Sequence, residues 1–385
     1  MATGRKRVDS MEAIVGRIAD FAAKNIATRP GLSSGMDFPH DLWRDMARSG
    51  FLGLGVPDEH GGSGLGYPGI SAAGRALARR GRCLGITLSW LMHQIVSRFP
   101  LCTFASSGQR QAYLTAMASG GFTASIAISE PGAGGHPRHL KTSVVRTSAG
   151  YILKGEKTFL TNGPIADLFV VLAMSGHDGD RKRFSAFLVP RGCAGLTVTG
   201  PMDVGFLRPC QHGGILLDGC MVPEESLIGS PGTAYEDMAV PFRDVEDTAM
   251  MGPLLGAQEA RFDDIVQALQ KKGELLQEET AYRLGGLYSS LGALEVLARE
   301  SALVLEDEGV SESLLPLVIS FRSQFVQVHT EMSEIASMAD LHPSEGWHTL
   351  SHDLDHVVNF AGRVSRLKQI KLGAGIASGG SMTGR

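Results

Sequence analysis

Residues 155–173 have the sequence GEKTFLTNGPIADLFVVLA. Two short runs rich in β-branched and aromatic residues flank an Asn-Gly-Pro turn, a pattern that predicts strands. Similar runs recur on both sides of this stretch: TASIAISE (123–130), FSAFLVP (184–190), LTVTG (196–200) and GILLDG (214–219). Because they are short and separated by turn residues, we expect a central β-domain over residues 123–229, built as a small antiparallel barrel or sandwich.

The sequence on either side of this β-domain has a helical period. Segments such as MEAIVGRIADFAAKNIA and EETAYRLGGLYSSLGALEVLARESALVLEDEG repeat apolar residues at three- and four-residue spacing. We therefore expect an N-terminal helical domain over residues 1–122 and a C-terminal helical bundle over residues 230–385. The predicted fold class is α+β, in the order α, β, α.

Composition excludes several classes of function. The chain has 385 residues, 43% of them hydrophobic, and a formal net charge of -4, so it lacks the basic surface of a nucleic-acid or membrane-binding protein. Its first residues have no apolar core of a secretory signal, and we expect a soluble cytoplasmic protein. The five cysteines are far apart and form no C-x-x-C pair, so a zinc or redox site is not predicted. Cys220 is expected to be a small core residue.

Four stretches carry a more specific signal. They are FPHDLWRDMARSGFLGLGVPDEHGGSGL (38–65), IAISEPGAGG (126–135), GEKTFLTNGPIADLFVVLA (155–173) and VGFLRPCQHGGILLDGCMVPEESLIG (204–229). In this order and spacing the chain resembles the acyl-CoA dehydrogenase family. The resemblance implies a flavin-dependent oxidoreductase of fatty acid metabolism that binds FAD, removes an α-proton and a β-hydride from an acyl-CoA, assembles as a tetramer and passes electrons to an electron-transfer flavoprotein.

The strands supply candidate flavin contacts. Ile128, Ser129 and Thr161 offer backbone N–H groups and hydroxyls to the polar edge of a flavin ring. Phe159 lies two residues before Thr161, so on a strand both side chains share a face, and the aromatic ring could cover the flavin. The alternative is that both are ordinary strand residues packed in the core.

A glycine-rich turn follows the first of these segments. The glycines of PGAGG, including Gly134 and Gly135, would let backbone amides approach a pyrophosphate. A plain glycine turn without a ligand is the alternative. The family's Ser-Asp after this point is here Gly135-His136.

The catalytic base of the family is a glutamate in one of two positions. The commoner position, near the C-terminus, is here Ala374, within Gly373-Ala374-Gly375. The isovaleryl-CoA dehydrogenase branch has G-A-G there and carries its base in a D-x-E-R helix, which Asp244-Val245-Glu246-Asp247 resembles. Glu246 is therefore the candidate base. Asp247 replaces the family's arginine, so we expect a second carboxylate to raise the pKa of Glu246 without a positive counterweight. A solvated acidic face is the alternative interpretation.

Two motifs by which a neighbouring subunit completes the family's flavin site are absent. LQKKGELLQEETAYRLGG (269–286) stands where R-x-x-F-G is expected, and EIASMADLHPSEGW (334–347) stands where Q-x-x-G-G-x-G is expected. Weakened FAD binding follows from these losses. A non-catalytic or half-site subunit of a mixed tetramer and a flavin monooxygenase or oxidase on the same scaffold are the alternative functions.

Three histidines near the C-terminus have a helical spacing. His348, His352 and His356 recur at a spacing of four, which is compatible with metal binding on a helix. Surface histidines without a metal are the expectation.

Overall fold

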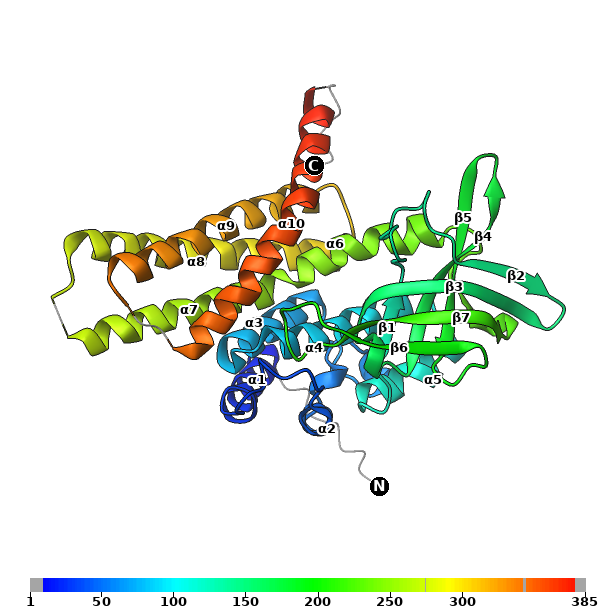
Figure 1. Ribbon diagram of the computed structural model, residues 1–385, viewed down its shortest axis with the longest axis horizontal. Helices are drawn as coiled ribbons and strands as arrows, with labels where there is room; N and C mark the ends of the chain where they lie inside the picture. The colour runs from blue at the N-terminus through cyan, green and yellow to red at the C-terminus, as the bar shows by residue number, and fades with distance from the viewer. Residues whose placement is uncertain (1–9, 274, 342–343, 378–385) are drawn as a thin grey trace. The chain divides into compact units, whose positions relative to one another are not determined.

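The computed structural model describes residues 10–273, 275–341 and 344–377. Its helices precede and follow a central run of strands, as predicted (Figure 1). The α-helices are α1 (Met11–Asn25), α2 (His40–Arg48), α3 (Tyr67–Gly81), α4 (Leu84–Val96), α5 (Ser107–Ala118), α6 (Val240–Ala249), α7 (Met251–Lys272), α8 (Glu278–Asp307), α9 (Leu314–Met338) and α10 (Glu345–Ala377). The strands are β1 (Ala124–Ala127), β2 (Ser143–Thr147), β3 (Gly150–Thr161), β4 (Leu168–Asp178), β5 (Arg181–Pro190), β6 (Leu196–Met202), β7 (His212–Val222) and β8 (Leu227–Ile228).

The described residues form two compact units. The first, here called the sheet unit, comprises residues 34–66 and 88–246. The second, here called the helix unit, comprises residues 10–33, 67–87 and the described part of 247–377. The division into three domains at residues 122 and 229 stays a prediction.

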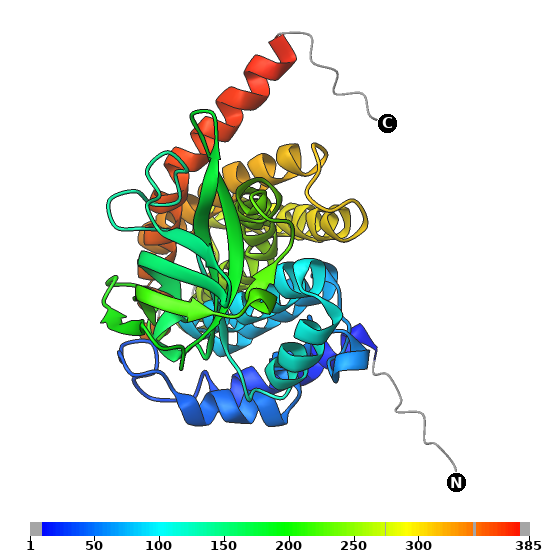
Figure 2. The same cartoon turned by 90° about the vertical axis from the view of Figure 1, so that its right-hand side faces the viewer.

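The strands of the sheet unit join in the order β6-β7-β3-β2-β4-β5-β8, and β1 pairs with β4. Most neighbours are antiparallel, as expected, but β1 and β2 each pair with β4 in parallel. The antiparallel prediction was wrong at these two pairings. Parallel neighbours need a long crossover, and the β2–β3 hairpin between β1 and β4 supplies it. Figure 2 shows the strands crossing at steep angles as the sheet curls.

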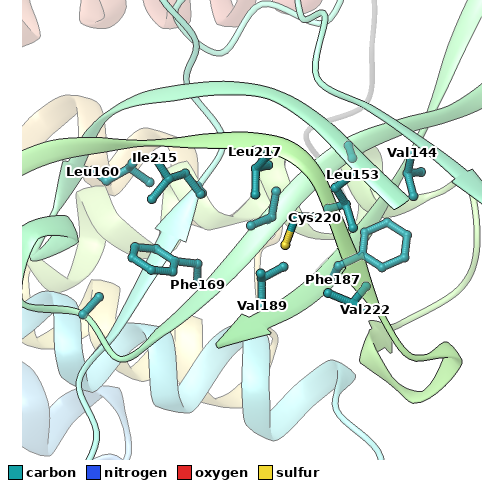
Figure 3. Packing of buried hydrophobic residues seen from close by; sticks show 14 residues of the cluster. Val144, Leu153, Leu160, Phe169, Phe187, Val189, Ile215, Leu217, Cys220 and Val222 are labelled. Atoms are coloured by element: carbon teal, nitrogen blue, oxygen red, sulfur yellow. The ribbon is translucent and has the colours of Figure 1, made fainter. Parts of the chain in front are cut away.

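Apolar side chains fill the inside of this curled sheet (Figure 3). Along the second half of β7 they alternate with exposed residues, which is the pattern of a sheet with one buried face. Residues 168–173 of β4 and 184–189 of β5 are instead buried without interruption. The cluster consists of Ala127, Val144, Leu153, Leu160, Ala166, Phe169, Val171, Ala173, Phe187, Val189, Ile215, Leu217, Cys220 and Val222. Cys220 lies in the core, as predicted.

Local sequence explains the ends of the helices. The Ser10 hydroxyl caps α1 by accepting from the Ala13 N–H at 3.3 Å, and the buried Ile14, Ile18 and Ala22 follow at a spacing of four. Ser106 and Gln109 form a capping box at the start of α5. These N-terminal helices are confirmed.

Within the helix unit, α7, α8 and α9 run beside one another (Figure 1). The buried face of α8 is rich in leucine, and that of α9 includes Phe321 and Phe325, whose rings stack at 5.9 Å between centroids. The buried face of α7 is formed largely by small and polar residues. The fully buried Arg261 of α7 bonds His329 of α9 at 2.9 Å and lies 4.2 Å from the ring centre of Trp347 in α10. Burial lowers the pKa of Arg261 to about 10, against the opposing charge of Asp355.

No helix among the described residues is both long and apolar enough to cross a membrane.

Candidate functional site

The residues predicted to contact a flavin edge lie on neighbouring segments of the sheet unit. The chain leaving β1 runs beside β3, where the Thr158 N–H donates to the Ser129 carbonyl oxygen at 3.0 Å. The Ser125 hydroxyl donates to the Thr161 carbonyl oxygen at 2.7 Å. Ile128, Ser129 and Thr161 are all partly exposed. The structure therefore places the three residues on two adjacent segments of the sheet unit, each of them partly exposed.

A buried ion pair joins the same two segments. The Lys157 ammonium, with no exposed side-chain surface, donates to a Glu130 carboxylate oxygen at 2.9 Å and to the Ile128 carbonyl oxygen at 3.0 Å. The backbone N–H groups of Lys141 and Thr142 donate to the same carboxylate at 2.6 and 2.9 Å. Glu130 thereby ties three parts of the chain together.

The pKa values of the pair follow from burial and charge. Burial lowers the pKa of Lys157 to about 8, against the attraction of Glu130. Burial also pushes the pKa of Glu130 upward, but the Lys157 charge and the bonds from Thr142 and Lys141 outweigh it, and the net shift is downward. We expect a charged pair, because the Lys157 ammonium and the Glu130 carboxylate bond each other and further backbone groups. The sequence motifs that contain Glu130 and Lys157 predict no role for either residue. The available signal was a charged residue inside each apolar strand segment.

Phe159 has an unusual backbone. Its φ is +57°, and the β3–β7 register shifts between Lys157 and Leu160. A bulky residue in the left-handed region is strained, and such strain is concentrated at ligand sites. Phe159 is 59% exposed while the next residue, Leu160, is 1% exposed. Burial thus alternates again after the bulge, and both Phe159 and Thr161 lie on the more exposed side.

The Asn-Gly turn after Thr161 is structural. Asn162 has φ +63° and is fully buried, and its side-chain NH₂ donates to the Ser89 carbonyl oxygen at 2.8 Å. Asparagine tolerates this conformation better than most residues. A Cβ on Gly163 would lie 2.9 Å from the Leu160 Cβ. The turn therefore fixes the end of β3, where Thr161 lies.

The glycine-rich turn after Glu130 is closed by its own hydrogen bonds. Glu130 and Gly134 exchange two backbone bonds of 2.9 and 3.1 Å, and the Ala133 N–H also donates to the Glu130 carbonyl oxygen. The amides of Ala133 and Gly134 thus already have partners within the turn. Gly134 is exposed and Gly135 is partly buried, and a pyrophosphate contact at either glycine stays a prediction.

Gly135 has two neighbours that sequence reasoning missed. The Tyr235 hydroxyl donates to its carbonyl oxygen at 3.2 Å. A Cβ at Gly135 would lie only 2.5 Å from an Arg243 Nη atom. Arg243 is exposed and gives this side of the turn a positive charge suited to an anionic group. A positive residue at the start of the helix that carries Glu246 was the available signal.

Glu246 lies on α6, three positions after Arg243. Residues at this spacing are neighbours on one helix face. Glu246 is partly buried, so it is neither a core residue nor fully solvated. The structure thus places the candidate base one helical turn from the arginine that touches the glycine-rich turn.

The expectation that Asp247 lacks a positive counterweight was wrong. Its carboxylate pairs with Arg322 of α9 and, at 2.7 Å, with Lys368 of α10. The Asp247 side chain is only 19% exposed. The physical reason is tertiary: cations about 75 and 121 positions away along the chain approach it through helix packing, which no local pattern reveals. The interpretation as a solvated acidic face therefore fails at Asp247.

The two segments that replace the missing motifs lie together in the helix unit. Arg283, the arginine of 269–286, pairs with Glu331 at 2.5 Å and Glu334 at 2.6 Å on α9. A hollow of about 370 Å³ separates the segments. Its lining is mostly aliphatic: Val266, Leu269, Gln270, Lys272, Leu275, Leu276, Gln277, Thr280, Leu284, Met338, Ala339 and Asp340. Residues 274 and 342–343, part of the same expectation, lie outside the described residues.

The remaining sequence candidates are on α10. Ala374 is exposed near the helix end and has no group that could serve as a base. The rings of His352 and His356 are 4.5 Å apart, and the His356 Nδ1 lies 2.9 Å from the His352 carbonyl oxygen. Among the residues that the structure describes, no three His, Cys, Asp or Glu side chains gather into a group that could hold a metal ion.

Comparisons with known proteins identify the family to which the chain is similar. The profile of the acyl-CoA dehydrogenase N-terminal domain matches residues 9–121, and that of the middle domain matches residues 125–220. An isovaleryl-CoA dehydrogenase of Solanum tuberosum is 29% identical over 76% of this chain and 73% of its own length. An L-prolyl-[peptidyl-carrier protein] dehydrogenase of Pseudomonas fluorescens is 34% identical over 58% of this chain and 59% of its own length.

Solved structures show the same fold. A glutaryl-CoA dehydrogenase from Mycobacterium smegmatis, in complex with FADH2, superposes with a TM-score of 0.81, covering 98% of this chain and 97% of that one at 18% identity. This likeness extends through the C-terminal helices, beyond the reach of both sequence profiles. The chain belongs to the acyl-CoA dehydrogenase family, and it is an acyl-CoA dehydrogenase-like flavin-dependent oxidoreductase.

Proposed function

We propose that the chain binds FAD on the sheet unit and dehydrogenates an acyl thioester, with Glu246 as the base. Phe159 covers a face of the flavin ring. Ser129 and Thr161, with the backbone at Ile128, donate hydrogen bonds to its polar edge. The flavin supplies a hydride acceptor, which no side chain of the protein can provide.

The exposed, strained Phe159 is the observation that carries the proposal. An aromatic side chain that is 59% exposed, on a backbone with φ +57°, costs stability in the free protein. Strain of this kind is concentrated at ligand-binding sites. It lies on the same more exposed side of β3 as Thr161, and Ser129 is held beside β3 by the bond to Thr158. An apolar face beside polar donors matches the two kinds of surface that a flavin presents.

Glu246 meets the chemical need for a base. Removal of an α-proton from a thioester requires a carboxylate within reach of that carbon, with basicity increased by a dry site. Glu246 is partly buried, and Arg243 lies one turn before it. We propose that Arg243 meets an anionic part of the substrate or cofactor and so helps to place the acyl group near Glu246.

The thioester carrier is either CoA or a peptidyl-carrier protein. The isovaleryl-CoA and prolyl-carrier relatives support one carrier each. A carrier-protein thioester is therefore the second candidate substrate. Parallel assays with acyl-CoA compounds and with prolyl-carrier protein distinguish the two. Only the thioester on the true carrier should reduce the flavin rapidly.

The test of the base compares Glu246→Gln with Asp244→Asn, a matched change on the same helix. FAD-loaded protein is mixed anaerobically with each thioester, and flavin reduction and exchange of the α-hydrogen with D₂O are followed. We expect Glu246→Gln to lose about a hundred- to ten-thousand-fold in both, and Asp244→Asn to lose much less. Equal rates for Glu246→Gln and the wild-type protein would contradict the role of Glu246.

We also propose that the chain works in the cytoplasm as a tetramer and passes electrons to an electron-transfer flavoprotein. Arg283 pairs with carboxylates of its own chain. This pairing supports a smaller contribution of a neighbouring subunit to the flavin site than in relatives with R-x-x-F-G. A half-site role would appear as co-purification with a second, more complete chain. An oxidase would consume oxygen rapidly once its flavin is reduced.

A further inference from the structure

Two cysteines that are 27 positions apart in sequence meet in the sheet unit. Cys193 lies in the turn between β5 and β6, and Cys220 lies on β7 inside the core (Figure 3). Their Sγ atoms are 2.7 Å apart. A disulfide bond is about 2.0 Å long, so a small movement would bring the two sulfur atoms to bonding distance. Sequence spacing gives no sign of this pair, because strand register, not sequence distance, brings the two cysteines together.

Backbone hydrogen bonds hold the turn against β7. The Asp218 N–H donates to the Gly195 carbonyl oxygen at 2.8 Å, and the Cys193 N–H donates to the Pro190 carbonyl oxygen at 3.0 Å. Gly195 has φ +84°, and a Cβ there would lie 2.7 Å from the Asp218 carbonyl oxygen. Only glycine allows this close approach. The contact between the two cysteines is therefore built into the turn.

The two thiols differ in access. Cys220 has no exposed surface, and burial, with a further contribution from Cys193, raises the pKa of its thiol to about 12. Cys193 is partly exposed, and its Sγ also lies 3.2 Å from the Met221 carbonyl oxygen. Cys193 is thus the thiol that a soluble oxidant can reach, and Cys220 is placed behind it.

We propose that Cys193 and Cys220 form a reversible disulfide through exchange with a small-molecule disulfide. The Cys193 thiolate attacks one sulfur of the oxidant and expels the first small thiolate, leaving a mixed disulfide. The Cys220 thiolate then attacks the Cys193 sulfur and expels the second. Two protein thiols are oxidised, one oxidant disulfide is reduced to two thiols, and the two protons pass to these leaving groups.

This modification site is remote from the proposed flavin site and independent of it. Cys220 pairs with Leu153 at one end of the β3–β7 ladder, whereas Thr161 pairs with His212 at the other. The eight residue steps from His212 to Cys220 span roughly 27 Å along a strand. The bond would tie the β5–β6 turn to β7 and stabilise the sheet unit, and we expect little change in flavin affinity.

The experiment treats the full chain with oxidised glutathione at several ratios to reduced glutathione. Intact mass, thiol counting and peptide mapping follow the products. We expect wild-type protein to lose two thiols and the mass of two hydrogen atoms, with a linked peptide pair containing Cys193 and Cys220. The oxidised protein should melt higher, on the order of 5 °C.

Three variants make the result decisive. Cys193→Ser changes a partly exposed residue and should abolish the intramolecular bond, and Cys220→Ala should leave a glutathione adduct on Cys193. Cys102→Ser, which changes another partly buried thiol, should still form the bond. A stable glutathione adduct on Cys193 of the wild-type protein, no oxidation at all, or a bond between other cysteines would each overturn the proposal.

Discussion

The two units hold their segments together by different means. In the sheet unit, the fully buried Lys157–Glu130 pair joins β3 to the chain after β1. In the helix unit, three arginines at and just after α3 meet acids on α7: Arg75 with Glu259, Arg79 with Asp263, and Arg82 with Asp264. Of these arginines Arg79 is 39% exposed. The Lys157–Glu130 pair is buried from solvent, whereas the arginine–carboxylate pairs of the helix unit are partly exposed.

The two kinds of ion pair constrain the sequence to different degrees. Removing the partner of a buried charge costs much stability. Substitutions of Lys157 or Glu130 in the strand segments are therefore poorly tolerated. Partly exposed pairs contribute little each, and a helix seam depends more on close backbone approach. A Cβ on Gly256 of α7 would lie 2.1 Å from the Arg75 carbonyl oxygen. The profile matches end at residue 220, yet the fold of the helices is retained.

Removal of the buried Lys157–Glu130 pair should have the largest effect on stability. Lys157→Met leaves Glu130 buried without its cation, and we expect a loss of about 3–5 kcal/mol of stability. Arg79→Met, the comparison in the helix unit, should cost less than about 1 kcal/mol. Urea unfolding combined with hydrogen exchange on peptides of each unit measures both. Equal costs would remove the contrast between the units, and Lys157→Met/Glu130→Gln should recover part of the loss.

Acid should weaken the sheet unit through His93. Burial lowers the pKa of this fully buried histidine of α4 to about 4, although the bond to the Met117 carbonyl oxygen opposes the shift. The unfolded chain takes up this proton near pH 6.5, so stability is lost as the pH falls from 6.5 to 4, by at most about 3 kcal/mol.

His93→Gln tests this linkage. Stability measured at intervals between pH 7 and pH 4 should fall less steeply for the variant than for the wild-type protein. The helix unit has a similar histidine, His329. Burial lowers its pKa, but the hydrogen bond to Asp355 opposes this shift. Parallel pH profiles for wild type and His93→Gln would contradict the assignment.

Close backbone contact should matter more than charge in the helix unit. Gly256→Ala forces α7 away from α3, and we expect a cost of about 1–3 kcal/mol. Gly285→Ala on α8 meets no atom within 4 Å and should stabilise by about 0.5–1 kcal/mol, because alanine favours a helix. Thermal unfolding of the two variants decides. If Gly256→Ala left the stability unchanged, the contact between α3 and α7 would accommodate the added methyl group without cost, and the prediction would be wrong.

Sequence reasoning predicted the parts of this molecule that local patterns determine. The order of helices and strands followed from apolar periodicity, and the placement of the Ser129 segment beside β3, which carries Thr161, followed from the family motifs. Partners distant in sequence were beyond its reach. Glu130 with Lys157, Cys193 with Cys220, and Asp247 with Arg322 meet only because strand register and helix packing bring them together, and neither is encoded in a single segment.

The central claim is that FAD binds at Phe159, Ser129 and Thr161 of the sheet unit. Its most direct test is titration of FAD into wild-type protein, Phe159→Gly and Thr161→Val, with Val145→Ala, an exposed change on β2 of the same sheet, as the control. We expect one flavin to co-elute with each wild-type chain, and each site variant to bind about tenfold more weakly. Phe159→Gly should also be at least as stable without FAD, because glycine relieves the left-handed backbone. A wild-type protein that binds no FAD, or site variants that bind it as well as Val145→Ala does, would contradict the account.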